Sequence, residues 1–131
     1  MKPSKSLTTT ALLVAMLSTL AAQAPAPFKR TVLQQADLSA PGREAVMALA
    51  EIQAGAASGR HTHPGEEIGY VLAGPVVIEI DGKPAKTYQA GDSFIIPPNT
   101  IHNAKSPGTA GVKIVSTYVI EKGKPVATPV P

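Results

Sequence analysis

Gly55-Ala-Ala-Ser-Gly-Arg-His-Thr-His-Pro-Gly-Glu-Glu-Ile-Gly-Tyr-Val-Leu-Ala-Gly74 is the most informative segment of this 131-residue chain. It holds two of the three histidines, His61 and His63, and the carboxylate of Glu67, while the third histidine, His102, follows a stretch marked by Gly and Pro. Three imidazoles and one carboxylate form a typical ligand set for manganese, iron, nickel or zinc. A His-x-His pair beside a turn often binds nothing, but the surrounding pattern leads us to predict one divalent metal ion at His61, His63, Glu67 and His102.

The spacing of these residues suits two hairpins that face each other. The two histidines of the segment are two positions apart, so on a strand both side chains point to the same face. Pro64-Gly65 would then turn the chain and let Glu67 begin the next strand beside them. His102 lies just beyond a turn that residues 97–100 (Pro-Pro-Asn-Thr) force. Four polar groups that converge inside a sheet structure are best explained by a bound ion.

The rest of the chain is typical of short strands separated by turns, because it contains 11 Gly and 13 Pro. Residues 44–52 include helix-favouring Ala, Met, Leu and Glu, but their apolar positions also alternate as in a strand. The Pro-rich tail 125–131 is a poor candidate for central pairing, because proline lacks the N–H that a ladder needs. We predict one domain over residues 25–131, an antiparallel sandwich or barrel. Its expected strands are 31–35, 44–52, 67–72, 76–80, 83–89, 93–96 and 112–120.

Two motifs give the chain a family resemblance. The segment 55–74 resembles the first motif of the cupins: a Gly, five residues, His-Thr-His, three residues, a Glu, six residues and a Gly. Residues 91–106 resemble the second motif, with Gly91, five residues, Pro97 and then His102. The resemblance covers about residues 30–122, and its first motif is complete.

The second motif departs from the family pattern at two positions. Asn99 stands where the family usually has Gly, which is a mild change because Asn adopts positive φ more readily than other non-glycine residues. Ser106 stands at a position of looser use where the family has Asn. The resemblance implies an all-β, antiparallel jelly-roll β-barrel, often a homodimer, with residues 44–52 as a strand. It also implies the metal role for the three histidines and Glu67.

Alternation around Glu67 assigns its neighbours to two faces. Gly69 and Val71 would share the metal face, while Ile68, Tyr70 and Leu72 would point away. Gly69 would either leave room for a small substrate or merely relieve strand packing, and Tyr70 would be a core or dimer contact.

Three charged residues near the motifs take lesser roles. Glu66 competes with Glu67 as the ligand, but the spacing favours Glu67 and leaves Glu66 as a rim charge. We expect Arg60 to be solvated and Asp92 to serve its turn.

Residues 1–24 are typical of a secretory signal peptide. Lys2 and Lys5 precede a short apolar run at 11–17 and small residues up to Ala24. Cleavage is expected between 21 and 24, with an uncleaved N-terminal anchor as the alternative. Export predicts a periplasmic or secreted protein without a stable membrane anchor after cleavage.

The remaining chain carries ten basic and nine acidic residues. It therefore has no basic stripe, and nucleic acid is not an expected partner. The absence of cysteine excludes disulfides and a thiol nucleophile.

Three functions fit the predicted site. The first is a metal-dependent oxidoreductase, dioxygenase-like, that acts on a small oxygenated organic compound. The alternatives are a non-catalytic metal or small-molecule binding protein of the cell envelope, and a metal-dependent isomerase or lyase. In an enzyme, the metal would act as a Lewis acid, and Glu67 would be the catalytic residue that shifts between ligand and general base. Oxygen uptake would separate the first function from the others.

Overall fold

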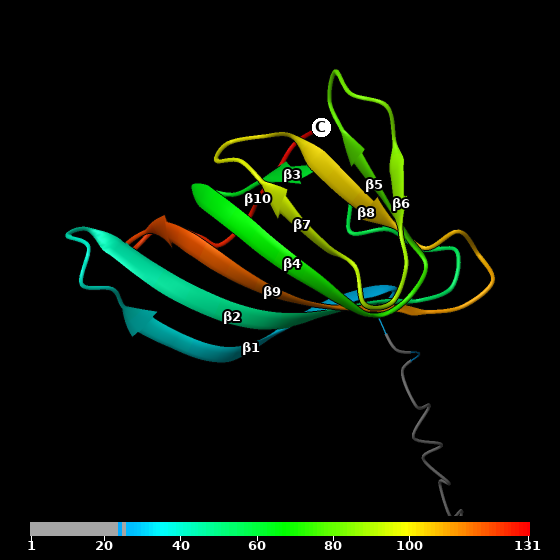
Figure 1. The fold of residues 1–131 in the computed structure, drawn as a ribbon, viewed down its shortest axis with the longest axis horizontal. Coiled ribbons are helices and arrows are strands. Elements are labelled where there is room, and N and C mark those ends of the chain that lie inside the picture. Colours follow the sequence, from blue (N-terminus) through cyan, green and yellow to red (C-terminus); the bar gives the residue numbers. More distant parts are fainter. Residues whose placement is uncertain (1–23, 25) are drawn as a thin grey trace, which may run out of the picture.

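The computed structural model describes residue 24 and residues 26–131, which form ten β-strands and no helix (Figure 1). Apart from Ala24, the predicted leader of residues 1–24 lies outside the described residues. Within the described part of the chain, no helix has the length and apolar character needed to cross a membrane. The strands are β1 (Phe28–Asp37), β2 (Arg43–Ile52), β3 (His61–Thr62), β4 (Gly65–Ala73), β5 (Val76–Ile80), β6 (Lys86–Tyr88), β7 (Ser93–Ile96), β8 (His102–Lys105), β9 (Val112–Glu121) and β10 (Thr128–Pro129).

The ten strands form two sheets of five strands each. The long sheet has the order β1-β2-β9-β4-β7, and the short sheet has the order β10-β3-β8-β5-β6. Every pairing within the sheets is antiparallel. The long strands β2, β4 and β9 run side by side, and the short sheet folds over them (Figure 1). The predicted all-β, antiparallel jelly-roll fold is confirmed.

Residues 44–52 form a strand, as the alternation of their apolar positions and the family resemblance implied. In β2, Val46, Ala48, Ala50 and Ile52 are buried, whereas Met47 between them is 39% exposed. Period-two burial fits a strand with one face on the core, and it outweighs the helix propensity of Ala and Met. Pairing with β1 on one side and β9 on the other fixes this orientation.

Two predicted strands differ most in extent from those in the structure. β1 is longer than the predicted 31–35, because its whole length pairs with β2. The predicted strand 83–89 is paired only as Lys86–Tyr88, since Gly82 has a positive φ of 76° and the turn after Ile80 extends over the next residues. The tail pairs only at the sheet edge, where β10 meets β3, as its prolines predicted.

Between the sheets, the apolar core forms a larger and a smaller cluster. Strand β9 contributes to both, and its inward residue Ser116 lies between Ile114 of the larger cluster and Tyr118 of the smaller one. A polar residue therefore interrupts the apolar face at the middle of the barrel. The larger cluster consists of Ala50, Ile52, Val71, Val76, Ile78, Phe94, Ile96, Val112 and Ile114, and the smaller of Val46, Ala48, Tyr118 and Ile120.

The two departures from the second motif have different outcomes. Asn99 adopts a φ of 55°, the left-handed conformation expected of it, and its N–H donates to the carbonyl of His63 at 2.8 Å. Ser106 is not loosely used, contrary to our expectation. Its buried hydroxyl donates to the carbonyl of Ala110 and accepts from the N–H of Gly55 at 3.1 Å, so it joins two loops.

Candidate metal centre

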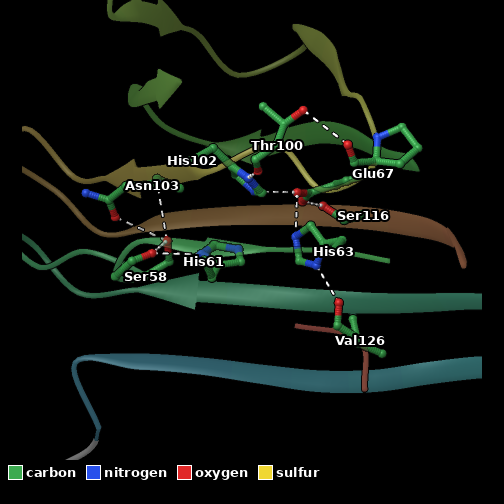
Figure 2. A network of polar contacts seen from close by, with 12 residues as sticks. Ser58, His61, His63, Glu67, Thr100, His102, Asn103, Ser116 and Val126 are labelled. Carbon is green, nitrogen blue, oxygen red and sulfur yellow. Dashed lines mark hydrogen bonds and ion pairs between the residues drawn. The ribbon is translucent and has the colours of Figure 1, made fainter. Parts of the chain in front are cut away.

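The structure brings the four predicted ligands together in the interior of the barrel (Figure 2). One potential ligand atom from each of His61, His63, Glu67 and His102 lies within 4.8 Å of the others, and all four residues are buried. The histidine rings are close neighbours, with centroids 4.3 to 5.0 Å apart. Residues up to 41 positions apart in the sequence therefore converge on one point, as their spacing predicted.

Both sheets contribute to this centre. His61 opens β3 and is the register partner of His102 at the start of β8, so the short sheet supplies these two imidazoles side by side. His63 follows directly after β3. Glu67 comes from β4 in the long sheet, where its register partners are Tyr118 and Ile96. The turn at Pro64 and Gly65 is thus the link that sets the carboxylate opposite the histidines, and the centre joins the two sheets.

A backbone carbonyl holds each histidine ring by its Nδ1 atom. His61 Nδ1 lies 2.7 Å from the Gly59 carbonyl, and His102 Nδ1 lies 2.8 Å from the Thr100 carbonyl. His63 Nδ1 contacts the carbonyl of Val126 in the C-terminal tail (Figure 2). A carbonyl only accepts, so in a neutral ring each Nδ1 carries the proton, and the lone pair of Nε2 can bind an ion. Hydrogen bonds of this kind, made by the ring nitrogen that does not bind the ion, orient histidine ligands in metal sites.

Glu67 divides its two oxygens between different partners. Oε2 lies 3.1 Å from Nε2 of both His63 and His102, whereas Oε1 accepts a hydrogen bond from the Ser116 hydroxyl at 2.7 Å (Figure 2). Burial raises the pKa of the Glu67 carboxyl, but the contacts with His102 and His63 and the hydrogen bond from Ser116 outweigh it and hold the pKa well below its usual range. Glu67 is therefore an anion at physiological pH, which suits a metal ligand better than a general base.

His61 is held in its neutral form. Burial lowers its pKa from 6.5 to about 4, against the bond to the Gly59 carbonyl, and the nearby His102, His63 and Arg30 add to the lowering. A neutral imidazole is the form that binds a metal. His61 is consequently ready to act as a ligand throughout the neutral range.

The environment of His63 Nε2 tests whether the centre fits a metal ion. This atom is buried and makes no hydrogen bond, although Glu67 Oε2 lies 3.1 Å away. A buried nitrogen without a partner costs free energy, and an ion bound among the four ligand atoms would give it one. The donor set of three imidazoles and one carboxylate also matches the preference of borderline divalent metals. These residues could therefore hold a metal ion.

A cavity lies beside the centre inside the barrel. Its volume is about 20 Å³, enough for one water molecule or a few ligand atoms. Its walls are mostly apolar, with Arg30 and Tyr118 among the polar exceptions. The lining residues are Phe28, Arg30, Ala50, Ile52, Ser58, His61, Glu67, Ile78, Phe94, His102, Ala104, Ile114 and Tyr118.

Gly69 does not leave room for a substrate, so the packing alternative is the correct one. A Cβ atom at this position would lie 2.2 Å from the Phe94 ring, which already occupies the space. The predicted facing in β4 is confirmed, since Gly69 and Val71 are buried and Ile68, Tyr70 and Leu72 are exposed. Tyr70 is 49% exposed, so it is not a core residue.

The remaining sequence expectations concern charged residues around the centre. Glu66 is partly buried on the outer side of β4, away from the centre, and forms no ion pair with any described residue. Arg60 is exposed, as expected, but it also pairs with Asp81 at 2.6 Å. Asp92 serves its turn by accepting from the N–H of Gln89 at 2.7 Å.

Sequence reasoning missed three residues of the site: Ser116, Tyr118 and Arg30. The first two had a readable signal, because alternation along 112–120 places both on the inner face of β9. The Tyr118 ring packs on His63 with centroids 4.6 Å apart, and burial, with the Glu67 charge, raises the pKa of its hydroxyl to about 12. Arg30 had no comparable signal, because its inward direction depends on the pairing of β1 with β2.

Comparison with known protein families gives a match that is consistent with the candidate metal centre. Residues 48–118 match the family model described as a cupin domain. A comparison with curated proteins gives no match.

Among solved structures, a cupin-like protein from Thermotoga maritima is 21% identical with a TM-score of 0.66, over 79% of this chain and 75% of that one. KdgF from a Halomonas species is 20% identical with a TM-score of 0.60, over 77% and 87%. The DMSP lyase DddQ from Ruegeria pomeroyi is 20% identical with a TM-score of 0.59, over 66% and 43%. At these identities the likeness concerns the fold alone.

Proposed function

The chain belongs to the cupin family, and from this premise we propose that it is an exported metal-dependent oxidoreductase, dioxygenase-like, acting on a small oxygenated organic compound. Its one divalent ion, manganese, iron, nickel or zinc, would be held by His61, His63, Glu67 and His102. The observation that carries this proposal is the convergence of four buried ligand atoms within 4.8 Å beside an internal cavity. A bound ion of this kind supplies Lewis-acid polarisation of a substrate oxygen and, if redox-active, activation of dioxygen.

Residues of the chain would orient the ligands, exclude water and move a proton. The three Nδ1 bonds to carbonyls hold the imidazoles in one orientation, and Ser116 holds the far oxygen of Glu67. The apolar cavity walls exclude bulk water and so strengthen the electrostatic interactions at the centre. In the enzyme, Glu67 would also move a proton, although its low pKa in the metal-free site makes it a weak base.

The decisive experiment measures metal content and substrate consumption on one sample, with and without oxygen. Protein loaded separately with manganese, iron, nickel and zinc would be offered chelating phenols, keto acids and dicarboxylates. Oxygen uptake that tracks substrate loss and disappears in His102→Ala supports the proposal. Glu66→Gln is the matched control, because its carboxylate lies outside the centre. Full metal occupancy without any turnover would replace the enzyme with a metal or small-molecule binding protein.

Tyr118 favours a second candidate, a metal-dependent isomerase or lyase. Its hydroxyl lines the cavity with a pKa raised by burial to about 12, so it stays protonated and offers a proton donor near the substrate. The structural neighbour named as a DMSP lyase is compatible with lyase chemistry on this fold. Substrate loss that is equal with and without oxygen would select this candidate, and Tyr118→Phe should then lower turnover without lowering metal content.

Export and assembly complete the proposal. The leader 1–24 would direct the chain to the periplasm or the medium, and mass determination of the mature protein from its native compartment would show a start between residues 22 and 25.

We also propose a homodimer formed through the outer face of the long sheet. Apolar side chains gather there on neighbouring strands: Met47, Ile68, Tyr70, Leu72 and Ile95.

A further inference from the structure

Arg30 is directed into the barrel, on the same cavity as the candidate metal centre. In β1 it is the register partner of Ala50, a buried residue of the core, so the two side chains share the inner face of the long sheet. The side chain lines the cavity together with His61, Glu67 and His102. A cation and a candidate metal site therefore face the same small space.

Two aromatic rings fix the guanidinium of Arg30. Its Cζ atom lies 5.2 Å from the centre of the Phe28 ring and 5.5 Å from the centre of the Tyr118 ring. Both distances fall within the range of cation–π contacts. These contacts hold the guanidinium beside the two rings without using the hydrogen-bonding capacity of its Nε.

The protein uses only part of the hydrogen-bonding capacity of Arg30, in a bond to the Tyr118 hydroxyl. Its Nε is buried and makes no hydrogen bond, and none of the ion pairs among the described residues includes Arg30. The other charged cavity residue, Glu67, is already bonded to Ser116 and His102. Buried polar groups are normally satisfied, so an unpartnered Arg30 Nε beside a cavity points to a ligand.

The chemistry of the cavity selects an anion of planar shape. With a divalent cation next to Glu67, the cavity would carry more positive than negative charge, which favours a negatively charged ligand. The Nε and one Nη of a guanidinium present two parallel donors that match the two oxygens of a carboxylate. The cavity volume of about 20 Å³ restricts that ligand to a few non-hydrogen atoms.

We propose that Arg30 binds the carboxylate of a small organic acid whose second oxygen, a 2-oxo or 2-hydroxy group, faces the centre formed by the three histidines and Glu67. This assignment rests on the proposed metal function and narrows it to a substrate class. Arg30 would orient the acid, and the centre would receive its second oxygen.

The test compares an acid with its neutral analogue. Isothermal titration calorimetry on zinc-loaded protein would use pyruvate and pyruvamide, which differ in the charged group, with glycolate and oxalate as further small carboxylates. We expect pyruvate to bind at least about tenfold more tightly than pyruvamide, the scale of a charge-assisted hydrogen-bond pair. Arg30→Met should abolish that preference, and Arg30→Lys should restore only part of it, since an ammonium lacks the fork. Lys29→Met, on the exposed outer side of the same strand, is the matched control and should leave the preference unchanged.

A second readout follows Arg30 directly. The chain has three arginines, so the Nε–H resonance of Arg30 can be assigned by its loss in Arg30→Met. Pyruvate should shift this resonance, and pyruvamide should not. Metal content measured on each sample separates the two proposals, because loss of metal binding would refute the metal function itself. With zinc bound, the inference is overturned by equal affinity for pyruvate and pyruvamide, by an Arg30→Met variant that keeps the preference, by failure of all three carboxylates to bind, or by inorganic phosphate binding in their place.

Discussion

Glu67 is the residue whose two oxygens have separate tasks. Ser116 holds Oε1, while Oε2 faces His63 and His102. Glu66, its neighbour in sequence, is on the opposite side of β4. The pair therefore offers two carboxylates, one at the centre and one outside it, within the same strand.

Replacing each of these carboxylates by an amide should give unequal results. Glu67→Gln should weaken metal binding by more than the roughly 10- to 100-fold that follows loss of a second-shell partner. Under excess metal, turnover should also fall by about 10²-fold or more, the scale of general-base loss. Glu66→Gln should leave both quantities nearly unchanged. Equal losses in a metal titration of the two variants would show that the ligand had been wrongly assigned.

The metal-free protein should lose stability in mild acid because of His61. The pKa of His61 is about 4 in the folded protein, against the ordinary value of 6.5 expected in the unfolded chain. Between these two pH values the unfolded chain therefore binds a proton that the folded chain does not. The free energy of unfolding must then decrease as the pH falls from 6.5 to 4, by at most about 1.4 kcal/mol per pH unit for one proton. Urea unfolding at several pH values in this window measures it. His61→Gln should flatten the curve, and a wild-type stability that rises toward acid would contradict the expected burial of a neutral imidazole.

At the scale of the strand, β9 illustrates what the sequence could and could not predict. Its burial alternates along the predicted run 112–120, and Ser116 could have been identified as the polar residue on the inner face. The ligands were predictable because the two motifs place them at fixed spacings on short strands. Arg30 was not, because its partner Ala50 lies 20 positions away and only the β1–β2 register shows that they share a face. Pairing between distant segments is information that local alternation does not contain.

The C-terminal tail that carries β10 contacts the candidate metal centre and also pairs with the short sheet. Val126 supplies the carbonyl for His63 Nδ1, and β10 pairs with β3, which carries His61. Deletion of residues 125–131 should therefore lower metal affinity about 10- to 100-fold, the usual effect of losing a second-shell partner, while the barrel stays folded. A shorter deletion of residues 129–131 keeps Val126 and should have a much smaller effect. Metal titration with circular dichroism on both variants tests this, and equal affinities would show that Val126 does not orient His63.

For the whole molecule, the outer face of the long sheet determines assembly. Ile68 and Ile95 are register partners and are 46% and 65% exposed, so β4 and β7 present an apolar surface to the solvent. A face of this kind on a monomer typically marks a contact site. We expect a two-fold homodimer at tens of micromolar by light scattering, and a monomer for Ile68→Asp combined with Ile95→Asp. Lys83→Asp, in the exposed turn after β5 of the short sheet, is the control. A wild-type monomer at that concentration would contradict the predicted interface.

The edges of both sheets have a consequence for solubility at high concentration. The short sheet ends in β10, whose Pro129 has no N–H, and in β6, which is three residues long and carries Lys86. The long sheet ends at β1, where the register shifts between Val32 and Gln34, and at β7, which is four residues long. Prolines, charges, short strands and bulges each deny an incoming strand a regular ladder. These edges therefore oppose growth of the sheets from copy to copy and leave face-to-face packing as the route by which two barrels can associate.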